Sequence, residues 1–268
     1  MRSEMSARRA TLCAAAAAGA MLLCSGANAE FVLDLAASSP QNAGNGGLFY
    51  STDLQPTGTG VLQPFVRIQG KPTEEGYNTD GTIEFDTKDN PGNWTHSITL
   101  SQVPIVNIGG VNYREFVLDI NETKSAAGRF LSMNEFQVFL SASASLTGFN
   151  RTAMTFASPG ATQVYDLDAG AHGDKLVRMD YSQASGSGSG DMFAYVQDSL
   201  FAGKTGPYVY LYSKFGVPDA SDAGFEEWAV RQGTTPPAGV PLPASVWGGL
   251  TLMGLLGAAK IRSRRQSA

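Results

Sequence analysis

Short alternating segments, separated by turn-forming residues, constrain the fold of this protein most. Residues 82–86 and 94–100 alternate polar and apolar side chains, as strands with one buried face do. Eight further strand-like segments are residues 61–69, 112–120, 135–140, 164–167, 176–181, 192–196, 208–212 and 225–230. No helical period of useful length interrupts them, although residues 141–146 are ambiguous. The sequence therefore predicts an all-β, sandwich-like body of short antiparallel strands.

Glycine and proline mark the turns and the end of this body. Gly109 and Gly110 stand between Ile108 and Val111, and a Gly-Gly pair tolerates the positive φ angles of a two-residue hairpin turn. Residues 234–239, Thr-Thr-Pro-Pro-Ala-Gly, resist both helix and strand. We therefore expect a β-rich body over residues 30–233 and a linker over 234–239.

Residues 1–29 have the pattern of a secretory signal peptide. Three arginines precede an apolar run over residues 10–23. Ala27 and Ala29 then form a small-x-small cleavage site, which places the mature start at Glu30. Both cysteines, Cys13 and Cys24, lie in this segment, so we expect an exported body without disulfides.

The C-terminal segment, residues 240–268, has three parts in a fixed order. A Pro-x-Pro motif comes first, an uncharged apolar run over residues 246–259 follows, and a basic cluster ends the segment. A membrane helix needs about 20 apolar residues, and the run from Pro241 to Ala259 has room for a short span. The basic cluster fits the cytoplasmic side of such a helix. The alternative is an apolar helix packed on a soluble core.

This segment resembles the PEP-CTERM sorting signal, most closely its VPLPA variant. The residues that carry the resemblance are Val240, Pro241, Leu242, Pro243, Ala244, Arg262, Arg264 and Arg265. The resemblance implies recognition by an exosortase-type membrane peptidase, cleavage near the proline motif, and delivery to the cell surface or the extracellular matrix. Leu242 stands where the commoner pattern has Glu, which leaves the subtype of peptidase open.

Four stretches of the body also resemble exported proteins of the same sorting group, for which no biochemical function is assigned. They are residues 107–121, 186–195, 208–216 and 224–229. This second resemblance supports the sorting interpretation and adds no mechanism.

The charge of the body excludes some partners. Without the two terminal segments it keeps 12 basic and 23 acidic residues, a formal net charge of −11. Such a body has no charge complementarity with nucleic acid or anionic polysaccharide. Solubility alone accounts for this charge, but it also permits cation binding.

Acidic residues after the strand at residues 112–120 offer oxygen ligands of the type that calcium prefers. Asp119 and Asn121 fall on one side by alternation, and Glu122 follows them. Asn134 and Glu135 come after a short loop. We expect these five residues to form a calcium site, although an ordinary solvated loop explains the same pattern.

Tyr208, Tyr210 and Tyr212 share one face of their expected strand, and Val209 and Leu211 share the other. If the aliphatic face is buried, the tyrosines form an outward stripe that could stack on the sugar rings of a matrix polysaccharide. The alternative is a strand covered on both faces.

The sequence contains no recognisable catalytic set. Its two histidines, His96 and His172, are far apart, so we expect no zinc site. No Gly-x-Ser-x-Gly motif is present either. We therefore expect a non-enzymatic binding or structural module. The alternative is a secreted carbohydrate-active hydrolase that uses Asp and Glu carboxylates.

Overall fold

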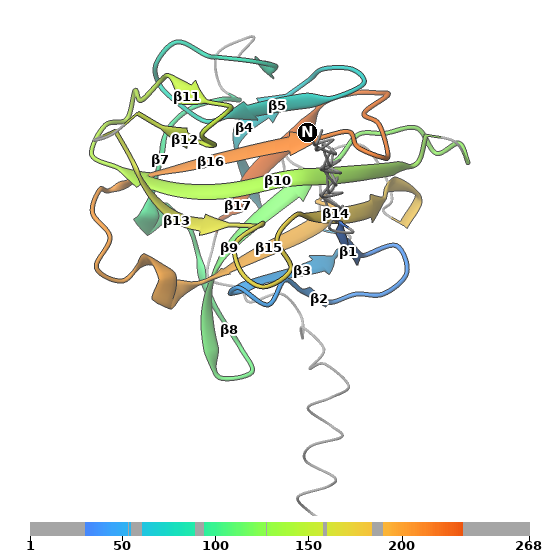
Figure 1. Ribbon diagram of the computed structural model, residues 1–268, viewed down its shortest axis with the longest axis horizontal. Coiled ribbons are helices and arrows are strands. Elements are labelled where there is room, and N and C mark those ends of the chain that lie inside the picture. Colours follow the sequence, from blue (N-terminus) through green and yellow to red (C-terminus); the bar gives the residue numbers. More distant parts are fainter. Residues whose placement is uncertain are drawn as a thin grey trace, which may run out of the picture.

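Two β-sheets packed face to face form the framework of the described residues (Figure 1). The computed structural model describes residues 30–52, 54, 61–88, 94–126, 128–157, 160–183 and 190–232. The all-β class predicted from the alternating segments is confirmed. In the described residues, the helical elements are three short 3-10 turns, η1 (Leu100–Gln102), η2 (Tyr181–Gln183) and η3 (Asp198–Phe201).

The first sheet has the order β1-β14-β10-β16-β5, with β13 also paired to β10 and β7 to β16. Its strands are β1 (Phe31–Asp34), β5 (Glu74–Tyr77), β7 (Ile98–Thr99), β10 (Phe130–Ser141), β13 (Thr162–Asp166), β14 (Lys175–Asp180) and β16 (Tyr208–Phe215). All neighbours are antiparallel except β1 and β14, which are parallel. A small hairpin of β11 (Phe149–Asn150) and β12 (Thr155–Phe156) lies outside this sheet.

The second sheet has the order β2-β3-β15-β9-β17-β4-β6, with β8 also paired to β9. Its strands are β2 (Gln41–Asn42), β3 (Gly47–Ser51), β4 (Leu62–Ile68), β6 (Thr87–Lys88), β8 (Ile105–Ile108), β9 (Val111–Asp119), β15 (Met192–Gln197) and β17 (Glu226–Arg231). The β8–β9 hairpin extends beyond the rest of the body at the lower edge of Figure 1. Gly109 and Gly110 form its turn, both with positive φ, which confirms the hairpin predicted there.

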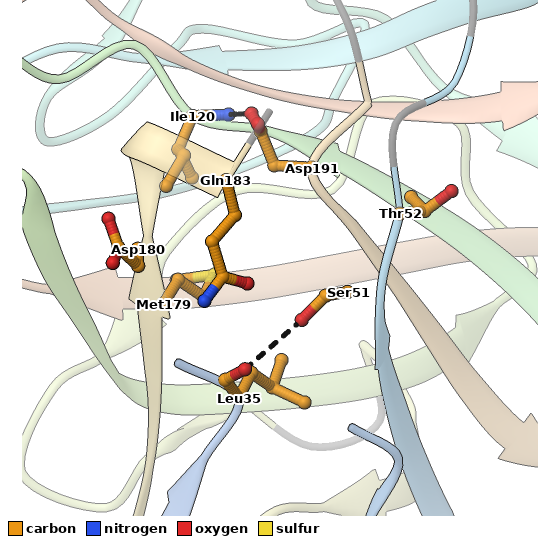
Figure 2. A pocket seen from close by; sticks show the side chains of 8 residues that line it. All are labelled: Leu35, Ser51, Thr52, Ile120, Met179, Asp180, Gln183 and Asp191. Carbon is orange, nitrogen blue, oxygen red and sulfur yellow. Dashed lines mark hydrogen bonds between the residues drawn. The ribbon is translucent and has the colours of Figure 1, made fainter. Parts of the chain in front are cut away.

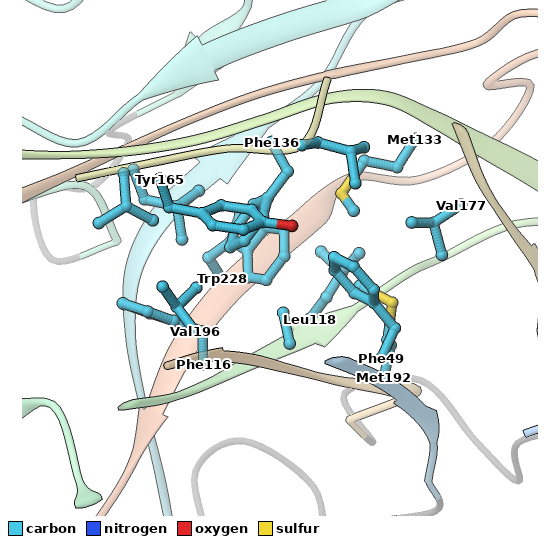
Figure 3. Packing of buried hydrophobic residues seen from close by; sticks show 14 of the residues in the cluster. Phe49, Phe116, Leu118, Met133, Phe136, Tyr165, Val177, Met192, Val196 and Trp228 are labelled. Carbon is cyan, nitrogen blue, oxygen red and sulfur yellow. The ribbon is translucent and has the colours of Figure 1, made fainter. Parts of the chain in front are cut away.

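Alternate residues of both sheets fill the main core (Figure 3). Trp228 of the second sheet stacks on Phe136 of the first, with ring centroids 5.0 Å apart. The indole N–H of Trp228 donates to Ser213 Oγ at 2.9 Å, so this buried polar atom has a partner. This aromatic pair and this hydrogen bond both connect the centres of the two layers.

Two of the predicted strands differ from the structure. Residues 82–86 form a turn in which Phe85 has a positive φ of 60°. The Glu84 carboxylate accepts hydrogen bonds there from the Tyr77 hydroxyl and from the N–H groups of Gly148 and Phe149, so it connects this turn to two other segments. The segment at 94–100 keeps only β7 as strand before η1 begins. Of the ambiguous residues 141–146, Ser141 ends β10 and the other five are not in a strand.

Candidate functional site

A fork in the second sheet creates a large groove. The first half of β9 pairs with β8, whereas its last residues pair with β17. Both partners lie on the side of β9 opposite β15, so β8 and the end of β17 diverge. A groove of about 700 Å³ lies between them. Its volume falls within the range of about 300–1,000 Å³ that is usual for ligand sites.

The described lining of this groove is neutral apart from Arg231. Its amide side chains are Gln63, Gln102, Asn107 and Gln232. Pro104, Val106 and Val230 supply apolar surface, together with Ile105, which is 51% exposed. Gln232 Nε2 donates to Gln63 Oε1 at 2.7 Å, which links two amides on one wall. A groove that combines amides with apolar surface suits an uncharged, extended ligand.

The edge of β8 adds backbone groups to this groove. In an antiparallel hairpin, alternate residues direct their N–H and C=O groups away from the partner strand. With a two-residue turn between Ile108 and Val111, the outward residues of β8 are Ile105 and Asn107, both of which line the groove. These donors and acceptors complement the neighbouring amides.

A buried ion pair holds the wall of the groove. Glu115 is fully buried, and its two carboxylate oxygens accept hydrogen bonds from Arg231 Nε at 2.7 Å and from Nη2 at 3.2 Å. The Tyr195 hydroxyl donates to the same carboxylate at 3.2 Å. Burial raises the pKa of Glu115, and the guanidinium of Arg231 opposes that shift. This ion pair links Arg231, the last residue of β17, to β9 at a point where the two strands are no longer paired by their backbones.

A second hollow, of about 240 Å³, lies where β9 ends and β15 begins, at the end of β9 opposite the groove. Figure 2 shows the side chains that line it. Asp191 Oδ2 accepts the N–H of Ile120 at 2.8 Å, and the Ser51 hydroxyl donates to the C=O of Leu35 at 3.3 Å. Asp180 Oδ1, also in the lining, accepts the N–H of Ser182 at 2.9 Å. These polar groups hold the ends of strands and turns, so the hollow has a structural explanation.

Buried carboxyl groups gather near this second end. Asp119 lies beside Asp191, and burial together with the charge of Glu227 raises the pKa of Asp119 to about 8. Burial and the nearby Asp222 raise the pKa of Glu122 to about 8. Carboxyl groups in such surroundings hold their protons near neutral pH.

The five residues predicted to bind calcium do not come together. Glu122 accepts the N–H groups of Asp222 and Ala223, both at 3.1 Å, and Asn134 bonds the backbone of Val217. The Asn121 side chain accepts a hydrogen bond from the Tyr181 hydroxyl at 3.4 Å. Burial, together with the nearby Asp168 and Asp166, raises the pKa of Glu135 to about 7. Asp119, Asn121 and Glu122 thus lie around the Tyr181 hydroxyl, whereas Asn134 and Glu135 have partners elsewhere. Within the described ranges, no group of three or more His, Cys, Asp or Glu side chains could hold a metal ion.

The prediction of an exposed tyrosine stripe is wrong. Tyr210 and Tyr212 are buried beneath the β11–β12 hairpin, and only Tyr208 is partly exposed. Phe149 stacks on Tyr212 with ring centroids 4.0 Å apart. The Tyr210 hydroxyl donates to the C=O of Ser143 at 2.7 Å. The strand is therefore covered on both faces, because a separate hairpin shields the aromatic side while Val209 and Leu211 face the core.

No local signal in the sequence marks the groove. Its lining comes from three separate segments: Gln63 on β4, residues 101–107, and the end of β17 with Gln232 directly after it. Isolated glutamines and asparagines are common on protein surfaces, and only the divergence of β8 from β17 brings these together. Knowledge of the strand order would have been needed to find them.

The two predicted targeting segments, residues 1–29 and 240–268, lie outside the described residues, as do the linker at 234–239 and the expected membrane helix at 246–259. Among the described residues, we find no helix with the length and apolar character needed to span a membrane. No family model, curated protein or solved structure matches this protein.

Proposed function

We propose that this protein is an exported, exosortase-sorted surface or matrix protein whose body is a non-enzymatic binding module for an uncharged polysaccharide. The groove between β8 and β17 is the observation that carries the binding proposal. Its amides can each donate and accept hydrogen bonds, as the neighbouring hydroxyls of a sugar require. The formal charge of −11 on the body disfavours anionic polysaccharides and nucleic acids.

The signal-type N-terminus and the VPLPA-type C-terminus support the route to the surface. The precursor would be held in the inner membrane by residues 246–259 and then be processed near the proline motif by the peptidase. Fractionation of cells with and without that peptidase tests this route, with a tag placed in the body. Processed protein at the surface or in the medium is expected only when the peptidase is present. A full-length, soluble cytoplasmic protein would refute the proposal.

Sedimentation of the purified protein with an insoluble neutral glucan tests the binding. Replacement of Gln63 and Gln232 with alanine removes two amides of the groove, and at about 1 kcal/mol for each net hydrogen bond it should weaken binding roughly tenfold or more. Gln163→Ala, an exposed amide on β13, is the matched control and should bind as the unchanged protein does. Equal binding by all three proteins, or preference for an anionic polysaccharide, would contradict the assignment of the groove.

A carboxylate hydrolase is the second candidate, favoured by one observation. Asp180 and Asp191 both line the 240 Å³ hollow, and paired carboxylates are the usual catalytic groups of glycosidases. Both carboxylates already accept backbone N–H groups, and the hollow is smaller than most ligand sites, which supports the binding module instead. Turnover of any member of a polysaccharide panel that is lost in Asp191→Asn would reverse this preference.

A further inference from the structure

Two glutamates meet in the space between the sheets. Glu74 stands at the start of β5 in the first sheet, and Glu226 stands at the start of β17 in the second. Glu74 is 1% exposed and Glu226 is fully buried. Their carboxyl groups lie within hydrogen-bonding reach of one another. The contact therefore bridges the two layers rather than neighbouring strands of one layer.

Three of the four oxygens of this pair lack a well-formed hydrogen bond from the protein. The backbone N–H of Gly70 donates to Glu74 Oε2 at 2.7 Å. The other oxygen of Glu74 and both oxygens of Glu226 are buried and accept no well-formed hydrogen bond, although the Ser221 hydroxyl and the Asn121 backbone lie nearby. A buried acceptor without a donor is costly, and native structures rarely contain three together.

The charged groups around the pair do not compensate for it. Asp86, before β6, faces Glu74, and Glu122, after β9, faces Glu226. Asp222 lies next to Glu122, and the ammonium of Lys71 donates to the backbone C=O of Asp222. On β4 and β17, Arg67 is paired with Glu227. Among the described residues, neither Glu74 nor Glu226 takes part in an ion pair.

We propose that Glu74 and Glu226 share a proton at neutral pH and so form a carboxyl–carboxylate hydrogen bond that clamps the two sheets together at this end. Two carboxylates in contact cannot both ionise at low cost when water and cations are excluded. A proton between them supplies the donor that the orphan oxygens lack. Burial, first of all, raises the pKa of both groups, and for Glu226 the contact with Glu74 adds to that shift.

The clamp makes stability depend on pH in a definite direction. Because the folded-state pKa of the pair is raised, the folded protein retains a proton that the unfolded polypeptide loses near pH 4.5. The stabilisation is fully present below that pH and is lost as the pH rises through the folded-state pKa. For one retained proton, the folding equilibrium constant falls up to about tenfold per pH unit in this window.

Urea unfolding from pH 5 to pH 9, with chelator present, tests the clamp. Glu226→Gln keeps the shape and provides an amide N–H₂ that donates to Glu74 without a shared proton. Its folding constant should fall less steeply with pH than that of the unchanged protein, by up to about tenfold per unit. Asp80→Asn removes the same charge at an exposed position and should leave the steep dependence in place. Glu74→Gln is the second variant and should behave as Glu226→Gln does.

Two outcomes would overturn the proposal. The first is the same pH dependence in the unchanged protein and in both glutamine variants. The second is stabilisation by calcium, magnesium or manganese at pH 8 that the glutamine variants lack, which would make the pair a cation site. If neither variant folds, the assigned carboxyl-carbon resonances of Glu74 and Glu226 in the unchanged protein decide. Coupled titration above pH 6 supports the shared proton, and ordinary titration of both near pH 4.5 refutes it.

Discussion

Replacement of Arg231 with methionine tests whether the wall of the groove depends on its buried ion pair. Methionine keeps much of the length of the arginine stem but removes the two hydrogen bonds to Glu115. The Tyr195 hydroxyl, at 3.2 Å, then remains as the donor nearest to that carboxylate among the contacts described. Glu115 is fully buried, so it cannot recover hydration while the strand stays in place. We expect it to take up a proton instead.

The cost of that proton sets the size of the effect. The unfolded polypeptide ionises Glu115 near pH 4.5, and each pH unit above this value adds about 1.36 kcal/mol to the cost of keeping it protonated in the folded state. Burial already raises the pKa of Glu115 in the unchanged protein, which therefore bears part of this cost. Arg231→Met should thus destabilise the protein by at most about 3 kcal/mol at pH 7 and by less than about 1 kcal/mol at pH 5. The stabilisation that the ion pair provides is therefore present above the raised folded-state pKa of Glu115 and is lost as the pH falls through that pKa.

Urea unfolding of the purified protein at pH 5 and pH 7 measures both values. The double variant Glu115→Gln with Arg231→Met has no buried charge, and we expect it to recover much of the loss at pH 7. Arg151→Met is the matched control, because its ion pair with Glu75 at 2.9 Å involves a side chain that is 55% exposed, and it should cost less than about 1 kcal/mol. If Arg231→Met lowers the free energy of unfolding equally at pH 5 and pH 7, the protonation argument is refuted.

Two further substitutions test the core and a buried lysine, each by urea unfolding. Trp228→Ala removes the ring stacked on Phe136 between the sheets and should cost about 3–5 kcal/mol, whereas a loss below about 1 kcal/mol would contradict the packing. Lys175 is 1% exposed and its ammonium donates to three backbone carbonyls. Lys175→Met should therefore lower the free energy of unfolding by about 2–4 kcal/mol. The control Lys204→Met, at an exposed position, should leave it almost unchanged.

The sequence predicted the strands well where alternation and turn residues agreed. The hairpin at Gly109 and Gly110 depends on two adjacent residues that accept positive φ, so a local signal was enough. The segments at 112–120 and 192–196 became β9 and β15, in which alternate apolar residues pack into the main core and the apolar residues between them pack into a second cluster on the other face. The order of the strands could not be predicted, because pairing between segments about 80 residues apart depends on packing rather than on local pattern.

The candidate sites could not be predicted for a related reason. Alternation showed that Tyr210 and Tyr212 share a face, but not that the hairpin of β11 and β12 covers it. Alternation also treats every carboxylate as an outward group, although Glu74 and Glu226 point into the space between the sheets. Burial of such polar residues is set by the contacts of the other layer, and those contacts are absent from any single segment.

Strand β17 carries both charge arrangements, and its geometry keeps them apart. Glu226 begins the strand and meets Glu74 between the sheets, whereas Arg231 ends it and meets Glu115 at the groove. Five residues of extended strand separate the two positions by about 17 Å. When two substituted sites are more than about 10 Å apart and share no partners, their changes in the free energy of unfolding usually add within about 0.5 kcal/mol. Glu226→Gln combined with Arg231→Met should therefore give the sum of the single effects in urea unfolding at pH 7. A coupling well above that margin would show that β17 transmits changes from the clamp to the groove, and binding would then follow the pH dependence of the clamp.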